Sequence, residues 1–197
     1  MPEKDSELKF SNSYELLICV ILSAQCTDKR VNQIAPAFFK KYPDIHSLAK
    51  ATYEEVFPFI KSVSYPNSKT RYLIGCAQVV EKKFEGEIPN NIDDLMSLPG
   101  VGRKTANVVL SIAFHKPSLA VDTHVYRVSH RLGLVSDKCT TPLSVEKELI
   151  KHIPEDKISQ SHFWLLYLGR YTCLSRKPKC QDCGLRNICL YFKKHKA

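Results

Sequence analysis

Long apolar runs are missing from this sequence of 197 residues. The longest lies between Leu16 and Leu22, far short of the roughly 18 residues that a membrane-spanning helix needs. The first residues, MPEKDSELKFSN, contain no apolar segment of the kind found in secretory signals. We therefore expect a cytoplasmic protein with no membrane as its partner.

Glycine is also scarce, with only seven residues, and apolar residues almost never alternate with polar ones. Both absences argue against a β-rich fold, whereas apolar residues recur at helical spacing almost throughout, so the sequence predicts an all-α protein. The apolar run at 16–22 predicts a central, buried helix from Ser13 to about Gln25. The pattern Thr52-x-x-Glu55 predicts a capping box at the start of another helix, and a long amphipathic helix should follow Asn67.

Acidic residues are outnumbered, with 20 Asp and Glu against 29 Lys and Arg, which leaves a formal net charge of +9. Such a chain favours a polyanionic partner, either nucleic acid or an anionic membrane surface. No basic amphipathic helix is evident, which disfavours the membrane surface. Nucleic acid is the better expectation.

Eight cysteines are present, and disulfides are not expected in the cytoplasm. Four of them are separated by six, two and five residues: Cys173, Cys180, Cys183 and Cys189. Their density indicates a four-thiolate metal site. Zinc ribbons use two short CxxC pairs and only one is present here, so the spacing favours a [4Fe-4S] cluster with one thiolate per iron, with zinc as the alternative. The remaining cysteines (Cys19, Cys26, Cys76, Cys139) are expected to be ordinary free thiols.

A glycine-rich turn, Leu98-Pro99-Gly100-Val101-Gly102, separates two short predicted helices at about 91–97 and 103–114. Glycines 100 and 102 are expected to turn with positive φ and to let the backbone approach a ligand closely. The amides that open the second helix would face outward and suit one phosphate. An interhelical turn without a ligand is the alternative.

Four motifs, which follow one another along the chain in the same order as in a known family, carry a resemblance to it. The sequence resembles the helix-hairpin-helix DNA glycosylases, in particular the endonuclease III family, from Ser13 to Cys189. The motifs are the stretch Leu98–Asn107, Val121-Asp122-Thr123-His124, Leu22–Asp28 and the C-terminal cysteine spacing.

The resemblance implies a two-domain all-α fold. A six-helix barrel domain would cover residues 13–116 and contain the helix-hairpin-helix at about 91–114. The second helical domain would combine residues 1–12 and 117–197 and carry the [4Fe-4S] cluster on the loop 173–189. The active site would lie in the cleft between the domains.

The resemblance also implies that Lys104 is the nucleophile and Asp122 the second catalytic group. Chemistry supports both roles independently. A lysine amine can attack the sugar C1′, expel the base and form a Schiff base, while a carboxylate stabilises the positive charge that develops on the sugar. Asp122 also stands where a helix N-cap is expected, and the two roles are compatible.

DNA contacts are expected from three regions. In the hairpin they would come from Gly100, Val101, Gly102, Arg103 and Thr105. The resemblance assigns gap filling to Gln25, and Tyr65 would be the opposite wedge, in a loop where Ser64-Tyr65-Pro66 departs from the family's glycine, aliphatic and aromatic residues. The basic tail should contact the DNA backbone through Arg176, Lys177 and Lys179.

The resulting hypothesis is a bifunctional glycosylase and abasic-site lyase that acts, as a monomer, on oxidised pyrimidines in double-stranded DNA. One alternative is a glycosylase of another specificity in the same superfamily. The other is a non-catalytic DNA-binding module, which the joint presence of Lys104 and Asp122 disfavours.

Overall fold

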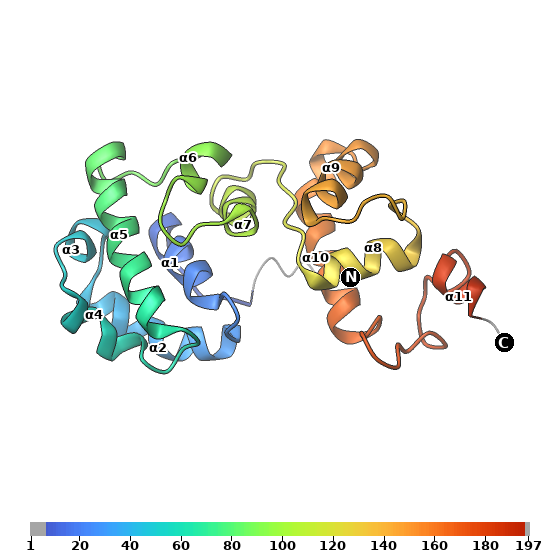
Figure 1. Ribbon diagram of the computed structural model, residues 1–197, viewed down its shortest axis with the longest axis horizontal. Coiled ribbons are helices and arrows are strands. Elements are labelled where there is room, and N and C mark those ends of the chain that lie inside the picture. Colours follow the sequence, from blue (N-terminus) through green and yellow to red (C-terminus); the bar gives the residue numbers. More distant parts are fainter. Residues whose placement is uncertain (1–6, 196–197) are drawn as a thin grey trace. The chain divides into compact units, whose positions relative to one another are not determined.

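The computed structural model describes residues 7–195, which fall into two compact units (Figure 1). In this part of the chain the first unit ends at His115 and the second begins at Lys116. Every regular element of residues 7–195 is helical, and none of these helices is long and apolar enough to cross a membrane. The units are described separately below.

Seven α-helices form the first unit: α1 (Ser13–Ser23), α2 (Asp28–Lys41), α3 (Ile45–Ala49), α4 (Tyr53–Ile60), α5 (Pro66–Phe84), α6 (Ile92–Met96) and α7 (Arg103–Ala113). Helix α1 lies in the middle of this unit and contacts α2, α5 and α7 (Figure 1). Its residues 16–22 are all buried, so the prediction of a central, buried helix is confirmed. The predicted ends differ, however. Asn12 rather than Ser13 is the N-cap, and the helix stops at Ser23 because Ala24 leaves the helical conformation with ψ 112°, followed by left-handed Gln25 with φ 54°.

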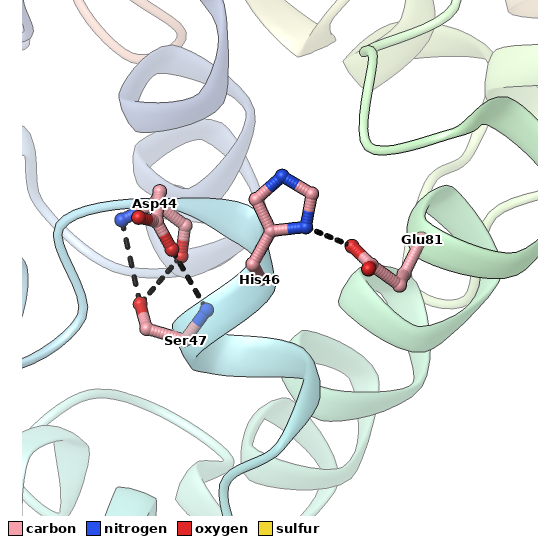
Figure 2. Close-up of polar contacts among 4 residues, drawn as sticks. All are labelled: Asp44, His46, Ser47 and Glu81. Atoms are coloured by element: carbon pink, nitrogen blue, oxygen red, sulfur yellow. Dashed lines mark hydrogen bonds and ion pairs between the residues drawn. The ribbon is translucent and has the colours of Figure 1, made fainter.

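Helices α3 and α4 begin with reciprocal capping boxes. The Thr52–Glu55 box is confirmed, since the Thr52 amide donates to Glu55 Oε2 at 2.8 Å. Figure 2 shows the second box, in which Asp44 and Ser47 cap each other, and next to it His46 reaching Glu81 on α5. The long helix α5 starts at Pro66, two residues earlier than the prediction of a helix that follows Asn67, and its N-cap is Tyr65 in a left-handed conformation.

Helices α8 (Thr123–Leu132), α9 (Pro142–His152), α10 (Ile158–Tyr171) and α11 (Leu190–Lys194), with the 3-10 turn η1 (Glu155–Lys157), form the second unit. It has its own apolar core, to which Val125, Val128 and Leu168 contribute. Helix α8 packs closely on α10, and a Cβ at Gly169 would lie 2.8 Å from His124 Cβ. The absence of a side chain at Gly169 is therefore what permits this approach.

The segment before α1 packs differently from the expectation that residues 1–12 belong to the second domain. In its described part, residues 7–12, Leu8 lies in the core of the first unit. Asn32 of α2 fixes the same segment, because it accepts from the Lys9 amide at 2.9 Å and donates to the Glu7 carbonyl at 2.8 Å. Residues 7–12 thus join the first unit, and residues 1–6 lie outside the described residues.

Candidate functional site

The glycine-rich turn joins α6 to α7 in the first unit. Gly100 has a φ of 79°, and the Val101 amide closes the turn on the Leu98 carbonyl at 3.1 Å. A Cβ at Gly100 would lie only 2.7 Å from Tyr72 Cβ, on α5. Position 100 therefore needs glycine both for its backbone conformation and for the space beside α5.

Gly102 behaves differently from the expectation of positive φ. It is the N-cap of α7 with extended backbone, φ −92° and ψ 174°, and its carbonyl accepts from the Ala106 amide at 2.9 Å. A Cβ at Gly102 would have no heavy atom within 4 Å. With no side chain at Gly102, the space at the start of α7 is open, and the first amides of any α-helix have no partner inside the helix. This arrangement can accept an anion.

The side chains of the turn divide into two groups. Lys104, the second residue of α7, is exposed, and its neighbours Arg103 and Thr105 are partly buried. Val101 is buried in the core of the first unit, so only its backbone can contact a ligand. The helix after the turn thus carries an exposed amine on its second residue.

Asp122 belongs to the second unit, where it caps α8. Its Oδ1 accepts from the amides of His124 at 2.9 Å and Val125 at 2.8 Å. The interpretation of Asp122 as an N-cap is thus confirmed. Both hydrogen bonds go to Oδ1, so Oδ2 is not part of the cap.

The structure brings the loops of Gln25 and Tyr65 together within the first unit. Both residues are exposed, and both have left-handed backbones, with φ 54° and 55°. The Ser64 hydroxyl donates to the Gln25 carbonyl at 2.6 Å and so joins the loop before α5 to the loop after α1.

Lys69, in the first turn of α5, was missed at the level of the sequence. Its side chain is only 4% exposed, and its Nζ donates to the carbonyls of Leu22 and Ala24, both at 2.7 Å. Burial lowers the pKa of Lys69. A signal was available, because Lys69 falls on the buried face of α5 at helical spacing from Leu73 and Val80.

All four C-terminal cysteines line one pocket in the second unit: Cys173, Cys180, Cys183 and Cys189. Within residues 7–195, no three His, Cys, Asp or Glu side chains are grouped so as to hold a single metal ion. The cations predicted to contact DNA lie on the same loop as the cysteines, and all three are exposed: Arg176, Lys177 and Lys179. A group bound in the pocket would therefore order the basic loop as well.

Two arginines of α8, Arg127 and Arg131, hold the start of this loop and were also missed. Arg131 Nη1 donates to Cys173 Sγ at 3.4 Å and to the Leu174 carbonyl at 2.6 Å. Arg127 Nε donates to the Cys173 carbonyl at 3.2 Å. Since Arg127 and Arg131 are four residues apart, both reach the loop from one face of α8.

The sequence is similar to known DNA repair proteins over most of its length. Residues 18–155 match the model of the HhH-GPD superfamily base excision DNA repair proteins. Endonuclease III of Rickettsia prowazekii (strain Madrid E) is 43% identical over 191 residues, which are 97% of this chain and 89% of that protein. The chain belongs to the endonuclease III family. The family member from Bacillus subtilis (strain 168) is 42% identical over 188 residues, 95% of this chain and 85% of that protein.

Solved structures of endonuclease III agree with this assignment. The structure of a trapped endonuclease III–DNA covalent intermediate matches with a TM-score of 0.91 and 44% identity. The match covers 98% of this chain and 90% of the endonuclease III chain in that structure. A thermostable thymine-DNA glycosylase has a TM-score of 0.86 and 29% identity, over 94% and 86% of the two chains. These matches confirm the all-α fold and the family resemblance. The protein is a base excision repair glycosylase and lyase that acts on DNA, so the alternative of a non-catalytic module is excluded.

Proposed function

We propose that this endonuclease III removes oxidised pyrimidines from double-stranded DNA, as a monomer, with Lys104 as the nucleophile and Asp122 as the second catalytic group. The observation that carries the proposal is the hairpin itself. Gly102, the N-cap of α7, leaves open space at the start of that helix, where a phosphate could reach the backbone, and Lys104, the second residue of the same helix, is exposed. A phosphate held there would bring a nucleotide of the same strand within reach of the amine.

In the proposed reaction the Lys104 amine attacks C1′ of the damaged nucleotide. The bond between C1′ and the base breaks, the base leaves with the electron pair and takes up a proton, and the amine loses a proton. Opening of the sugar ring gives a Schiff base between C1′ and Nζ. Loss of a proton from C2′ then expels the 3′ phosphate by β-elimination, which cuts the strand.

Asp122 is suited to stabilise the positive charge on the sugar during base release. The cap fixes the orientation of its carboxylate through two hydrogen bonds to Oδ1, while Oδ2 lies outside the cap. A preorganised charge of this kind needs little rearrangement during the reaction. The same bonds make Asp122 a stabilising residue for α8.

DNA affinity would come chiefly from phosphate contacts. The hairpin supplies backbone amides together with Arg103 and Thr105, and the basic loop supplies exposed cations. Such contacts are independent of sequence and sensitive to salt. Once the damaged nucleotide leaves the stack, Gln25 and Tyr65 would fill the gap, and Tyr65, at 63% exposed, is free to do so.

The four cysteines that line the pocket suit a [4Fe-4S] cluster. Four thiols on one loop and helix end provide the donor set that such a cluster takes. Bound there, its irons would supply four anchor points for residues 173–189. Arg131 already donates to Cys173 Sγ, and a cationic hydrogen bond to a ligand sulfur is a usual partner of such groups.

Borohydride trapping tests the proposal. The protein is incubated with duplexes that carry thymine glycol, an abasic site, a G–T mismatch or no damage, with and without borohydride, and the strands are resolved on a denaturing gel. We expect a covalent adduct on thymine glycol and abasic duplexes, and Lys104→Gln should abolish both the adduct and strand cleavage. Lys82→Gln, which removes an exposed lysine from α5, is the matched control and should leave both intact.

Two results would contradict the assignment. A trapped adduct with Lys104→Gln would mean that another amine is the nucleophile. Base release from the mismatch but not from thymine glycol would mean that the substrate is a mismatched base. This specificity is the second candidate, because Ser64-Tyr65-Pro66 differs from the residues that the family has in this loop.

A further inference from the structure

Lys69 caps a helix to which it does not belong. Helix α1 ends at Ser23, and its last carbonyls have no amide partner inside the helix. Lys69 Nζ, from α5, donates to the Leu22 and Ala24 carbonyls at this end, both at 2.7 Å. The positive charge also lies at the negative end of the α1 dipole, which is favourable.

The same residue holds the Tyr65 loop through its backbone. The Lys69 amide donates to the Tyr65 carbonyl at 3.1 Å, the first hydrogen bond of α5. Ala24 directly precedes Gln25, so the Lys69 side chain binds the residue before one proposed gap-filling residue. The Lys69 backbone amide binds the other, Tyr65. The Ser64–Gln25 hydrogen bond closes the link between the two loops at the surface.

A charged residue is a costly choice for this position. Lys69 is 4% exposed, and the partners of its amine are two neutral carbonyls rather than a carboxylate. A buried ammonium without a counter-ion is destabilising compared with an apolar side chain of similar size. The buried face of α5 around it is otherwise apolar at Leu73, Ala77 and Val80. The need for a fixed loop at Ala24 and Gln25 explains the lysine better than core packing does.

We propose that Lys69 is a positioning residue for gap filling. Its side chain holds the Gln25 loop, and through the Ser64–Gln25 hydrogen bond the Tyr65 loop, in the arrangement that replaces a flipped nucleotide in a duplex. The proposal rests on the proposed function, in which Lys104 performs the chemistry. Lys69 acts through the two loops, so it is needed when the damaged nucleotide must be drawn out of paired DNA. It is not needed for the reaction at an abasic site in a single strand, where there is no opposite base to separate.

The test compares strand cleavage at an abasic site in a duplex with cleavage at the same site in the single strand. Lys69→Met keeps the volume and removes the donors, and Lys82→Met removes the same charge from the exposed side of the same helix. We expect Lys69→Met to lower kcat/KM on the duplex about tenfold and to leave the single-strand value within about twofold, because only the loop bonds are lost. Lys82→Met should change neither value.

A double-mutant cycle shows whether Lys69 acts through Gln25. If it does, Gln25→Ala and Lys69→Met together should cost no more on the duplex than the larger single effect. Additive losses would overturn the proposal, and so would an equal loss on duplex and single strand, which is the signature of general damage to the fold.

If Lys69→Met does not fold, Ser64→Ala tests whether the coupling between the Gln25 and Tyr65 loops matters for cleavage of the duplex. This change removes one partly exposed hydroxyl, the donor to the Gln25 carbonyl, and leaves the core untouched. A loss confined to the duplex would support the coupling of the loops, and no difference from wild type would overturn it. Failure of the wild-type protein to cleave either substrate would instead refute the proposed function, so the two failures are distinguishable.

Discussion

Replacing Gly100 with alanine should destabilise the protein, whereas the same change at Gly102 should not. Gly100 has a φ of 79°, in the left-handed region that costs an L-residue about 1–2 kcal/mol. The new Cβ would also lie 2.7 Å from Tyr72 Cβ, which is fixed to the backbone of α5 and cannot rotate away. Relieving such a clash in a packed region typically costs a further ~1–3 kcal/mol.

The sum, about 2–5 kcal/mol, is a large part of the total stability of about 5–15 kcal/mol that a protein of this kind has. For a chain of this length each kcal/mol lowers Tm by about 2–4 °C, so Gly100→Ala should lower Tm by roughly 4–20 °C. Thermal unfolding followed by circular dichroism measures this. Truncating the neighbour in a Gly100→Ala, Tyr72→Ala double variant should not restore stability, because alanine keeps the clashing Cβ.

Gly102→Ala is the matched control for stability and the sharper probe of function. Its φ of −92° suits alanine and the new Cβ meets nothing within 4 Å, so stability should change by less than about 1 kcal/mol. The methyl group would enter the open space at the start of α7, and affinity for duplex DNA should fall about tenfold if it displaces one charged, hydrogen-bonded phosphate. Equal stability of Gly100→Ala and wild type, or full DNA affinity of Gly102→Ala, would refute the reasoning.

Four further predictions follow from the site and the caps. Anaerobically purified protein should hold about four irons per chain, and Cys180→Ser should lower the iron content and speed hydrogen exchange in residues 173–189; stoichiometric zinc without iron would contradict the cluster. Lys177→Ala and Lys179→Ala should each reduce the slope of log affinity against log salt by about 0.9, and Lys40→Ala on α2 should not. Asp122→Asn should slow release of thymine glycol while retaining cleavage at a preformed abasic site, with nearly unchanged Tm because asparagine also caps helices; a large loss of Tm would mean that the carboxylate is chiefly structural. The Thr52 amide lowers the pKa of Glu55, so the stabilisation by this carboxylate is complete above its unfolded pKa of about 4.3 and is lost as pH falls through the folded pKa; the difference in stability between wild type and Glu55→Gln, measured by urea unfolding, should therefore shrink in acid.

Features that depend on neighbours in the sequence were predicted from the sequence. The Thr52–Glu55 box and the Asp122 cap each join residues at most three positions apart, and the side chains alone indicate them. The end of α1 at Ser23 and the start of α5 at Pro66 were missed, because the left-handed residues next to them, Gln25 and Tyr65, are not glycines. Such a conformation is held by the surroundings, here the Ser64–Gln25 hydrogen bond between loops 39 residues apart.

The supporting residues of the site escaped prediction for the same reason. Cysteine spacing is local, so four candidate ligands could be proposed from the sequence, but Arg131 reaches Cys173 from 42 residues away. Lys69 reaches Leu22 from 47 residues away, and neither segment has a sequence pattern that predicts this hydrogen bond. From the sequence, the same backbone conformation was predicted for both hairpin glycines. The structure distinguishes them, because Tyr72 packs against Gly100, whereas a Cβ at Gly102 would meet no heavy atom within 4 Å.

Helix α5 relates the two parts of the first unit that the proposed reaction uses on DNA. Tyr65 caps its start, Lys69 in its first turn holds the Gln25 loop, and Tyr72 packs against Gly100 of the hairpin. At 1.5 Å per residue, the positions of Tyr65 and Tyr72 are separated by about 10 Å along the helix axis. A single helix therefore sets the spacing between the proposed gap-filling loops and the proposed phosphate-binding turn. Because this helix lies within the first unit, the spacing should be kept unless α5 itself bends or unwinds.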